Sequence, residues 1–228
     1  GRTMKTLASA LMVAISLLGC ASTPVPNDGL LIFDPELRLA HENRATAMIA
    51  PRPAMTTPSG PAIYNCHAYL STPDRAEIAA APANRNAAAD YVLCDSLSLL
   101  QGAFATTAES GELDMGRSLA TRLDLRSFRS SRHQRSTDDA FTLEALAGQP
   151  LKIGPRTAEL ESPDWYFKLE VVAVADIDGS GEVDWLVWVV DQSLTGSYFT
   201  VSPLVVIDPV EDGLLEAAVE PLQVPNRP

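Results

Sequence analysis

Residues Trp165–Ala175 read WYFKLEVVAVA, and two later segments, WLVWVV at residues 185–190 and LVVI at residues 204–207, are equally rich in aromatic and aliphatic side chains. Aromatic and β-branched residues are enriched in strands, whereas the intervening segments contain Asp, Gly and Ser, which favour turns. Three strands joined in this way predict an antiparallel β-meander. Helical patterns precede the strands, so we expect an α+β domain over residues 62–228, with the helices covering one face of the sheet.

The region before the strands contains periodic patterns of both kinds. Apolar residues recur at helical spacing in residues 84–106, which predicts an amphipathic helix. Apolar and polar residues alternate in residues 118–126, which predicts a half-buried strand. A second, short helix is expected to begin at residues 137–139 and to end at Gly148, because glycine often terminates helices.

An acidic turn lies between the first two strand segments and reads DIDGSGEVD at residues 176–184. Oxygen-bearing side chains occur at alternate positions, and two glycines allow the backbone to curl around a central point. Proteins bind Ca²⁺ through several oxygen ligands in a flexible geometry, which such a turn can supply. The alternative is a polar hairpin turn without an ion, since Asp and Gly favour turns in any case. The predicted ligands are Asp176, Asp178, Ser180, the backbone carbonyl of Glu182, and Asp184.

This stretch resembles the aspartate-rich calcium loops of FG-GAP and VCBS-type repeats, in which DxDGxGxxD separates two apolar strands. The resemblance covers about 20 residues and implies the same set of ligands. Ser180 replaces the more usual Asp or Asn, which implies weaker binding. The motif occurs once, whereas a β-propeller needs several blades, so we do not expect a propeller. Strands on both sides of the loop favour a structural role for Ca²⁺ over a catalytic one.

The N-terminal stretch has the layout of a bacterial export signal. Residues 4–20 read MKTLASALMVAISLLGC, with one lysine, an apolar run too short to span a bilayer, and a final Gly19 and Cys20. The last four residues, LLGC, resemble a lipobox, the motif of bacterial lipoproteins. The resemblance implies that residues 1–19 are a signal peptide and that Cys20 becomes the lipid-bearing N-terminus, with diacylglycerol and palmitate as anchor. The alternative is a buried N-terminal helix that ends in an incidental cysteine.

Residues 20–61 are rich in proline, which prevents long regular elements and predicts a tether that holds the domain off the membrane. One short helix is expected inside this tether. Asp34 would be its N-cap, Pro35 would occupy its first position, and the helix would end before Pro51.

The charge and the cysteines restrict the function further. The formal net charge of −12 argues against nucleic-acid binding and against attachment to anionic lipid by charge. If Cys20 is lipidated, Cys66 and Cys94 remain as a pair in an oxidising compartment, which predicts a disulfide. Two buried free thiols are the alternative, and a metal site that uses His67 has no supporting spacing.

A basic run at residues 126–135 is interpreted as a solvated loop, with phosphate or lipopolysaccharide binding as the alternative.

These features predict a lipid-anchored protein of the cell envelope, held in the outer membrane and facing the periplasm. We expect it to be a binding or assembly module with a structural Ca²⁺ site, and we predict no catalytic residue. Its expected contacts are the membrane, through the lipid, and envelope proteins or polysaccharide. The alternative is an envelope hydrolase that acts on peptidoglycan or polysaccharide, with catalytic residues too scattered along the chain to be recognised.

Overall fold

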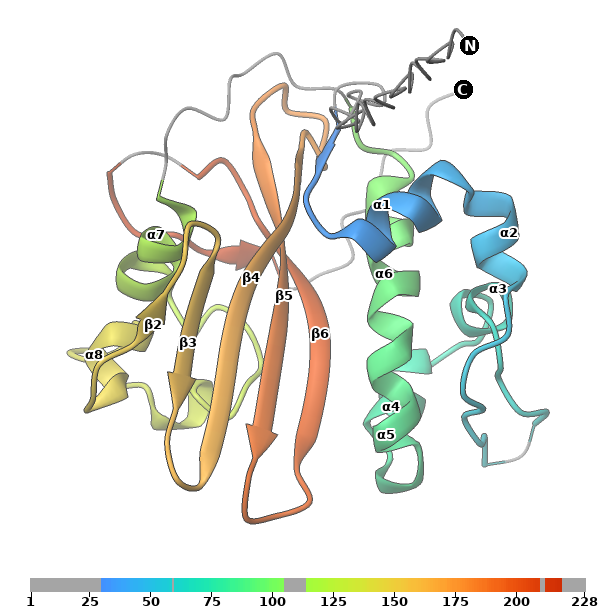
Figure 1. Ribbon diagram of the computed structural model, residues 1–228, viewed down its shortest axis with the longest axis horizontal. Coiled ribbons are helices and arrows are strands. Elements are labelled where there is room, and N and C mark those ends of the chain that lie inside the picture. The colour runs from blue at the N-terminus through green and yellow to red at the C-terminus, as the bar shows by residue number, and fades with distance from the viewer. Residues whose placement is uncertain (1–29, 59, 105–113, 210–211, 219–228) are drawn as a thin grey trace, which may run out of the picture.

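The computed structural model describes residues 30–58, 60–104, 114–209 and 212–218. The predicted signal peptide and Cys20 therefore lie outside the described residues. Within the described part, an antiparallel sheet of seven strands forms the centre of the molecule (Figure 1). This confirms the predicted α+β class and its β-meander. In spatial order the meander consists of β2 (Lys152–Ile153), β3 (Thr157–Glu161), β4 (Trp165–Ala175), β5 (Asp184–Ser193), β6 (Phe199–Val206) and β7 (Ala217–Ala218), while β1 (Leu31–Ile32) pairs with β4.

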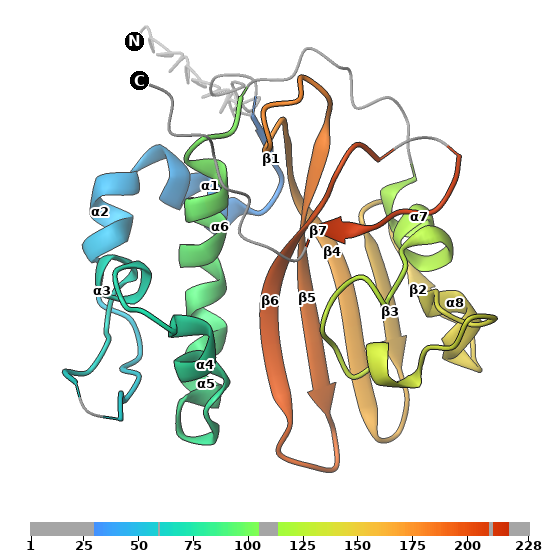
Figure 2. The same cartoon turned by 180° about the vertical axis from the view of Figure 1, so that it is seen from behind.

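Helices cover both faces of this sheet, whereas the sequence predicted cover on one face (Figures 1 and 2). One face packs against α7 (Met115–Arg122) and α8 (Leu143–Ala147). The other side carries α1 (Pro35–Glu42), α2 (Arg44–Ile49), α3 (Cys66–Leu70), α4 (Arg75–Ala80), α5 (Arg85–Ala88) and α6 (Val92–Leu100). Single 3₁₀ turns occur at η1 (Pro82–Asn84), η2 (Ala89–Tyr91) and η3 (His133–Arg135).

Strand β4 contributes side chains to two hydrophobic cores, one on each face of the sheet. Phe167 and Leu169 point into the core shared with α7, as alternation along a strand requires. A register shift against β5 between Val171 and Ala173 then inserts one extra residue, so that both Val172 and Ala173 face the core shared with α1 and α6. Because both faces of the strand are covered, its sequence is almost continuously apolar.

The segment from residue 30 to residue 58 belongs to the folded domain, although the sequence placed it in the tether. Strand β1 pairs with the end of β4, and two backbone amides, those of Phe33 and Asp34, donate to the carbonyl of Val172 at 2.8 and 3.2 Å. The Asp34 carboxylate caps α1 by accepting from Leu37 N at 2.7 Å, with Pro35 in the first turn as expected. The fold therefore begins well before the predicted boundary at residue 62.

Two predictions of local structure differ from the observed elements. Residues 118–122 belong to α7 and not to a strand. The helix predicted for residues 84–106 is a series of short helices that ends with α6, and residues 105–106 lie outside the described part. The helix expected from residues 137–139 begins later, at Leu143, where the Thr142 hydroxyl caps it, and ends at Gly148 as predicted.

Cys66 of α3 and Cys94 of α6 form a disulfide, as predicted, and both residues are fully buried. The bond joins two helices that pack in a third, smaller core with Tyr69 and Tyr91.

Among the described residues no helix is long and apolar enough to cross a bilayer.

Candidate metal centre

The acidic loop connects the two longest strands of the sheet. Asp176 follows the last residue of β4, and Asp184 is the first residue of β5. The backbone of Asp176 also pairs with that of Phe104, through N–O distances of 2.8 and 3.2 Å. The apolar strands on either side therefore fix both ends of the loop, while its tip at Ser180 is exposed.

The Asp176 carboxylate organises the turn. Its two oxygens accept from Gly179 N at 2.7 Å and from Gly181 N at 3.0 Å. Both glycines have positive φ angles, 80° and 93°, which side-chain-bearing residues adopt at a cost. The glycines of the motif are thus required to wrap the backbone around a carboxylate.

Asp184 links this loop to the turn after β6. Its side chain is completely buried and accepts from Ile177 N at 2.7 Å, from Asp178 N at 3.3 Å and from Asp208 N at 3.1 Å. Burial raises the pKa of the Asp184 carboxyl and the nearby Asp178 charge acts in the same direction, while the three amides oppose them, and the net result is a pKa of about 6. A buried carboxylate with a raised pKa is one whose negative charge is incompletely compensated by its protein partners.

The structure brings three of the predicted residues together. One carboxyl oxygen from each of Asp176, Asp178 and Asp184 lies within 4.8 Å of the others. Two oxygens bound to the same Ca²⁺ at 2.3–2.6 Å each are at most about 5 Å apart, so this spacing suits one shared ion. The amide hydrogen bonds do not exclude it, because a carboxylate oxygen has two lone pairs. Asp184 Oδ2 uses both on Ile177 N and Asp178 N. Asp184 Oδ1 and the two Asp176 oxygens, in contrast, each accept one amide and keep one lone pair for an ion. The group therefore fits a metal ion, and its all-oxygen chemistry suits a hard cation.

The other two predicted ligands lie at the exposed side of the loop. The Ser180 hydroxyl donates to the Asp208 carboxylate at 3.4 Å and accepts from Glu182 N at 3.2 Å, and the Glu182 residue is exposed. Asp208 is a residue that the sequence analysis missed. It has a positive φ of 43° and touches the loop through both its backbone and its side chain.

The basic run is more integrated into the fold than the sequence predicted. Ser131 donates to the buried Asp191 carboxylate of β5 through its backbone nitrogen at 2.6 Å and its hydroxyl at 2.7 Å. Arg132 is only 3% exposed, and its guanidinium lies 5.6 Å from the centre of the Trp165 ring. Burial lowers the pKa of Arg132, with the charge of Arg135 acting in the same direction. This segment is therefore fixed to the sheet and is not a freely solvated loop.

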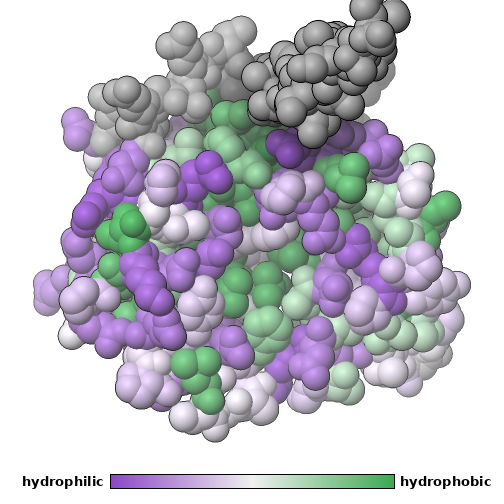
Figure 3. All heavy atoms as spheres, viewed as in Figure 1, coloured by the Kyte–Doolittle hydropathy of each residue, from purple (hydrophilic) through white to green (hydrophobic). Residues whose placement is uncertain are grey.

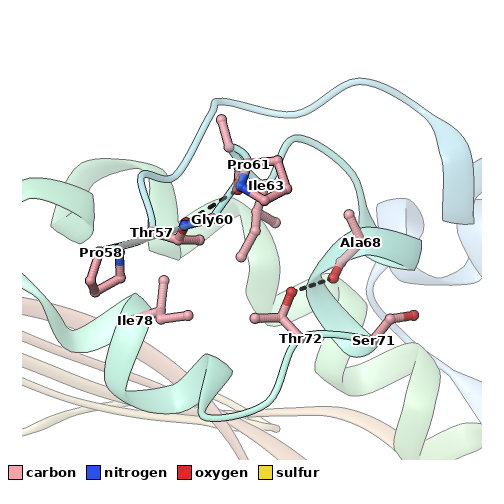
Figure 4. Close-up of a pocket in the computed structure, with 10 residues that line it drawn as sticks. Thr57, Pro58, Gly60, Pro61, Ile63, Ala68, Ser71, Thr72 and Ile78 are labelled. Carbon is pink, nitrogen blue, oxygen red and sulfur yellow. Dashed lines mark hydrogen bonds between the residues drawn. The ribbon is translucent and has the colours of Figure 1, made fainter.

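A hollow of about 370 Å³ lies between residues 57–58 and 60–63 on one side and helices α3 and α4 on the other (Figure 4). Apolar groups and hydroxyls line it, and its lining residues include neither a carboxylate nor a histidine. Two of the hydroxyls already bind the backbone: Thr57 Oγ1 donates to Pro61 O at 3.3 Å, and Thr72 Oγ1 donates to Ala68 O at 2.7 Å. The hollow thus lacks the acid–base pair that glycoside hydrolysis uses.

The fold and the site together define an α+β protein whose acidic hairpin loop could hold a metal ion. Comparison of the chain with protein-family models, with curated proteins and with solved structures gives no significant match in any of the three. Its function is therefore inferred from its own residues.

Proposed function

We propose that the protein is a lipid-anchored component of the bacterial cell envelope that acts as a binding or assembly module and carries one structural Ca²⁺ in the loop at residues 176–184. The observation that carries the Ca²⁺ site is the convergence of three carboxylates at the end of the β4–β5 hairpin. The anchor rests on the resemblance of residues 17–20 to a lipobox. Ala21 follows Cys20 where an Asp would resemble an inner-membrane retention signal, so delivery to the outer membrane is favoured.

Ca²⁺ is favoured over other cations by the ligand chemistry. Asp176, Asp178 and Asp184 offer oxygen only, which disfavours Zn²⁺ as the resident ion. Mg²⁺ demands a small, nearly ideal octahedron, whereas Ca²⁺ accepts a flexible and larger set of oxygens. The exposed side of the loop, at Ser180 and Glu182, leaves room for the remaining ligands and water.

A structural role is favoured by the position of the carboxylates. An ion between Asp176 and Asp184 would hold the end of β4 to the start of β5, and Asp184 already holds the turn at Asp208. Ca²⁺ would also offset the repulsion among three carboxylates that lie within a few ångströms of one another. The hollow bordered by α3 and α4 has no carboxylate or histidine in its lining, so it does not supply the acid–base pair of a glycoside hydrolase.

The Ca²⁺ site is tested by thermal unfolding of metal-free protein in a Ca²⁺ titration. At ten times its dissociation constant the ion should stabilise the fold by about 1.4 kcal/mol. For a chain of this size this corresponds to a rise in Tm of about 3–6 °C. Asp178→Asn and Asp184→Asn should each remove most of the rise. Glu182→Gln is the matched control and should keep it, because only the backbone oxygen of Glu182 is proposed to bind. An identical Tm in EDTA and in several millimolar Ca²⁺ would exclude the site.

The anchor is tested by fractionating cells that produce the full chain or its Cys20→Ser variant. The wild type should sediment with membranes and incorporate a labelled palmitate, and the variant should do neither. If Cys20→Ser fractionates with membranes like the wild type, Cys20 is not the anchor.

A further inference from the structure

Three large hydrophobic side chains in and just after the first two helices are exposed to solvent. Leu39 of α1, Ile49 of α2 and Tyr64 expose 61%, 66% and 56% of their surface, the largest values among the large hydrophobic residues that the structure describes as exposed. Helix α2 contains no buried residue at all. Figure 3 shows apolar residues on the surface at the side of the molecule where α1 and α2 lie. The described part of the chain leaves these side chains uncovered.

Chain length restricts what can cover them. Cys20 lies ten positions before Leu30, where the described chain begins, and ten residues span at most about 35 Å. Strand β1 then leads directly into α1 (Figure 2). A chain anchored through Cys20 therefore keeps Leu30, which directly precedes β1 and α1, within about 35 Å of the lipid surface.

The net charge of the chain does not favour contact with a lipid surface, so such a contact would have to form through apolar side chains. The chain carries a formal net charge of −12, so an anionic lipid surface does not attract it as a whole. Helices α1 and α2 are locally balanced, however, with Glu36 and Glu42 against Arg38 and Arg44. This face is thus not repelled as the rest of the surface is, and aliphatic and tyrosine side chains are suited to the membrane interface.

We propose that the exposed side chains of Leu39 in α1, Ile49 in α2 and Tyr64 in the segment between α2 and α3 form a docking face that contacts the lipid surface of the membrane that holds the anchor. The inference rests on the lipid anchor proposed above. The β5–β6 turn lies at the far end of the sheet from β1, because β1 pairs with the opposite end of β4 from the end that pairs with Ser193.

The test measures the depth of single fluorophores in the lipidated full chain, bound to vesicles of phosphatidylcholine and phosphatidylglycerol. Leu39→Cys and Ile49→Cys supply attachment points for an environment-sensitive label, since the other thiols are taken by lipid and disulfide. Leu194→Cys, in the β5–β6 turn and 47% exposed, is the matched control. Spin-labelled lipid should quench the labels at positions 39 and 49 about twofold or more and leave the label at position 194 nearly unchanged.

Three results would either refute the docking face or show that the docking face and the lipid anchor fail independently of each other. Equal, weak quenching at positions 39, 49 and 194 in protein that still floats with vesicles refutes the docking face and leaves the anchor intact. Labels at positions 39 and 49 that are shielded without lipid quenching, in protein that elutes as a dimer, assign the face to a second copy of the chain instead. If Cys20→Ser floats like the wild type with both labels quenched, the docking face stands and the lipid anchor fails.

Discussion

At Gly116 the backbone of α7 lies against the β2–β3 hairpin with no room for a side chain. Its amide donates to Pro155 O at 3.1 Å. A Cβ at this position would overlap the backbone oxygen of Gly154 and would meet the backbone oxygen and nitrogen of Thr157 at 2.5 and 2.9 Å. Because these neighbours are backbone atoms, they cannot move aside as a flexible side chain could.

Gly116→Ala should therefore destabilise the protein by about 3 kcal/mol, the upper end of the cost of overpacking, as measured by urea unfolding. Gly148→Ala is the matched control, since Gly148 has open space around it and a φ of 61°. Its cost should be about 1 kcal/mol, from the left-handed backbone alone. If the two variants are equally stable, α7 does not pack as closely as the structure indicates.

Asp95 makes stability depend on pH. Its carboxylate accepts from the Tyr69 hydroxyl at 2.9 Å and pairs with Arg75 at 3.4 Å, yet burial outweighs these partners and raises the pKa of Asp95. The native state then holds this proton more tightly than the unfolded chain does. The stabilising contribution is complete below the unfolded pKa, about 3.9, and is lost as the pH rises through the native pKa.

Asp95→Asn keeps an acceptor for Tyr69 but cannot ionise. The free energy of unfolding of the variant minus that of the wild type should therefore increase as the pH rises above about 4. Urea unfolding of both proteins at a series of pH values measures this difference. A difference that is constant or that decreases with pH would show that the ionised carboxylate is not destabilised in the fold.

The part of the candidate site that lies in one short segment of the chain could be predicted from the sequence. Asp176, Asp178 and Asp184 lie within nine consecutive residues, and the glycines between them indicate how the backbone turns. Asp208 could not be predicted as a neighbour. It reaches the loop because β5 and β6 pair with Trp185 opposite Val206. The sequence around Asp208 is one acidic residue after an apolar run, and it does not indicate how the two strands pair.

At the scale of elements, the long strands were predicted because one sequence signal covered each of them. Strand β4 has the predicted bounds, since nearly every residue in it is aromatic, aliphatic or buried. Helix α7 was mistaken for a strand because its signal is ambiguous. Leu119 and Leu123 fit an alternation of period two, but with Met115 they also recur every four residues, and all three are buried. The Asp114 carboxylate, which caps the helix through Arg117 N at 2.9 Å, decides between the two readings.

The disulfide should be the main constraint on the α3–α6 pair. It closes a loop with a sequence separation of 28, which corresponds to about 3.5 kcal/mol of stabilisation by loss of chain entropy in the unfolded state. The double variant Cys66→Ala/Cys94→Ala should lose about this amount in urea unfolding. Reducing agent should lower the stability of the wild type and leave the variant unchanged. If reductant affects neither protein, the two thiols are not bonded in solution.

At the scale of the whole molecule, the N-terminal segment completes the second layer of helices. Leu37 of α1 belongs to the core that includes Leu97 of α6 and Val172 of β4, so this layer joins residues from distant parts of the chain. Proline content alone suggested a spacer, because composition reports on regular structure within a segment and not on pairing with a strand more than a hundred residues away. The short β1 carries too few residues to give a pattern of its own.

Two leucines of α1 test whether this layer contributes to global stability. Leu37 is fully buried and Leu39 is 61% exposed, although they lie two residues apart in the same helix and have the same helix propensity. Leu37→Ala should cost about 3 kcal/mol, since it removes buried methyl groups and leaves a cavity in the core. Leu39→Ala should stay within about 0.5 kcal/mol in the absence of lipid. A single cooperative urea transition that shifts only for Leu37→Ala would show that α1 unfolds with the sheet. Two equally small shifts would instead mean that the domain is stable without its N-terminal helices.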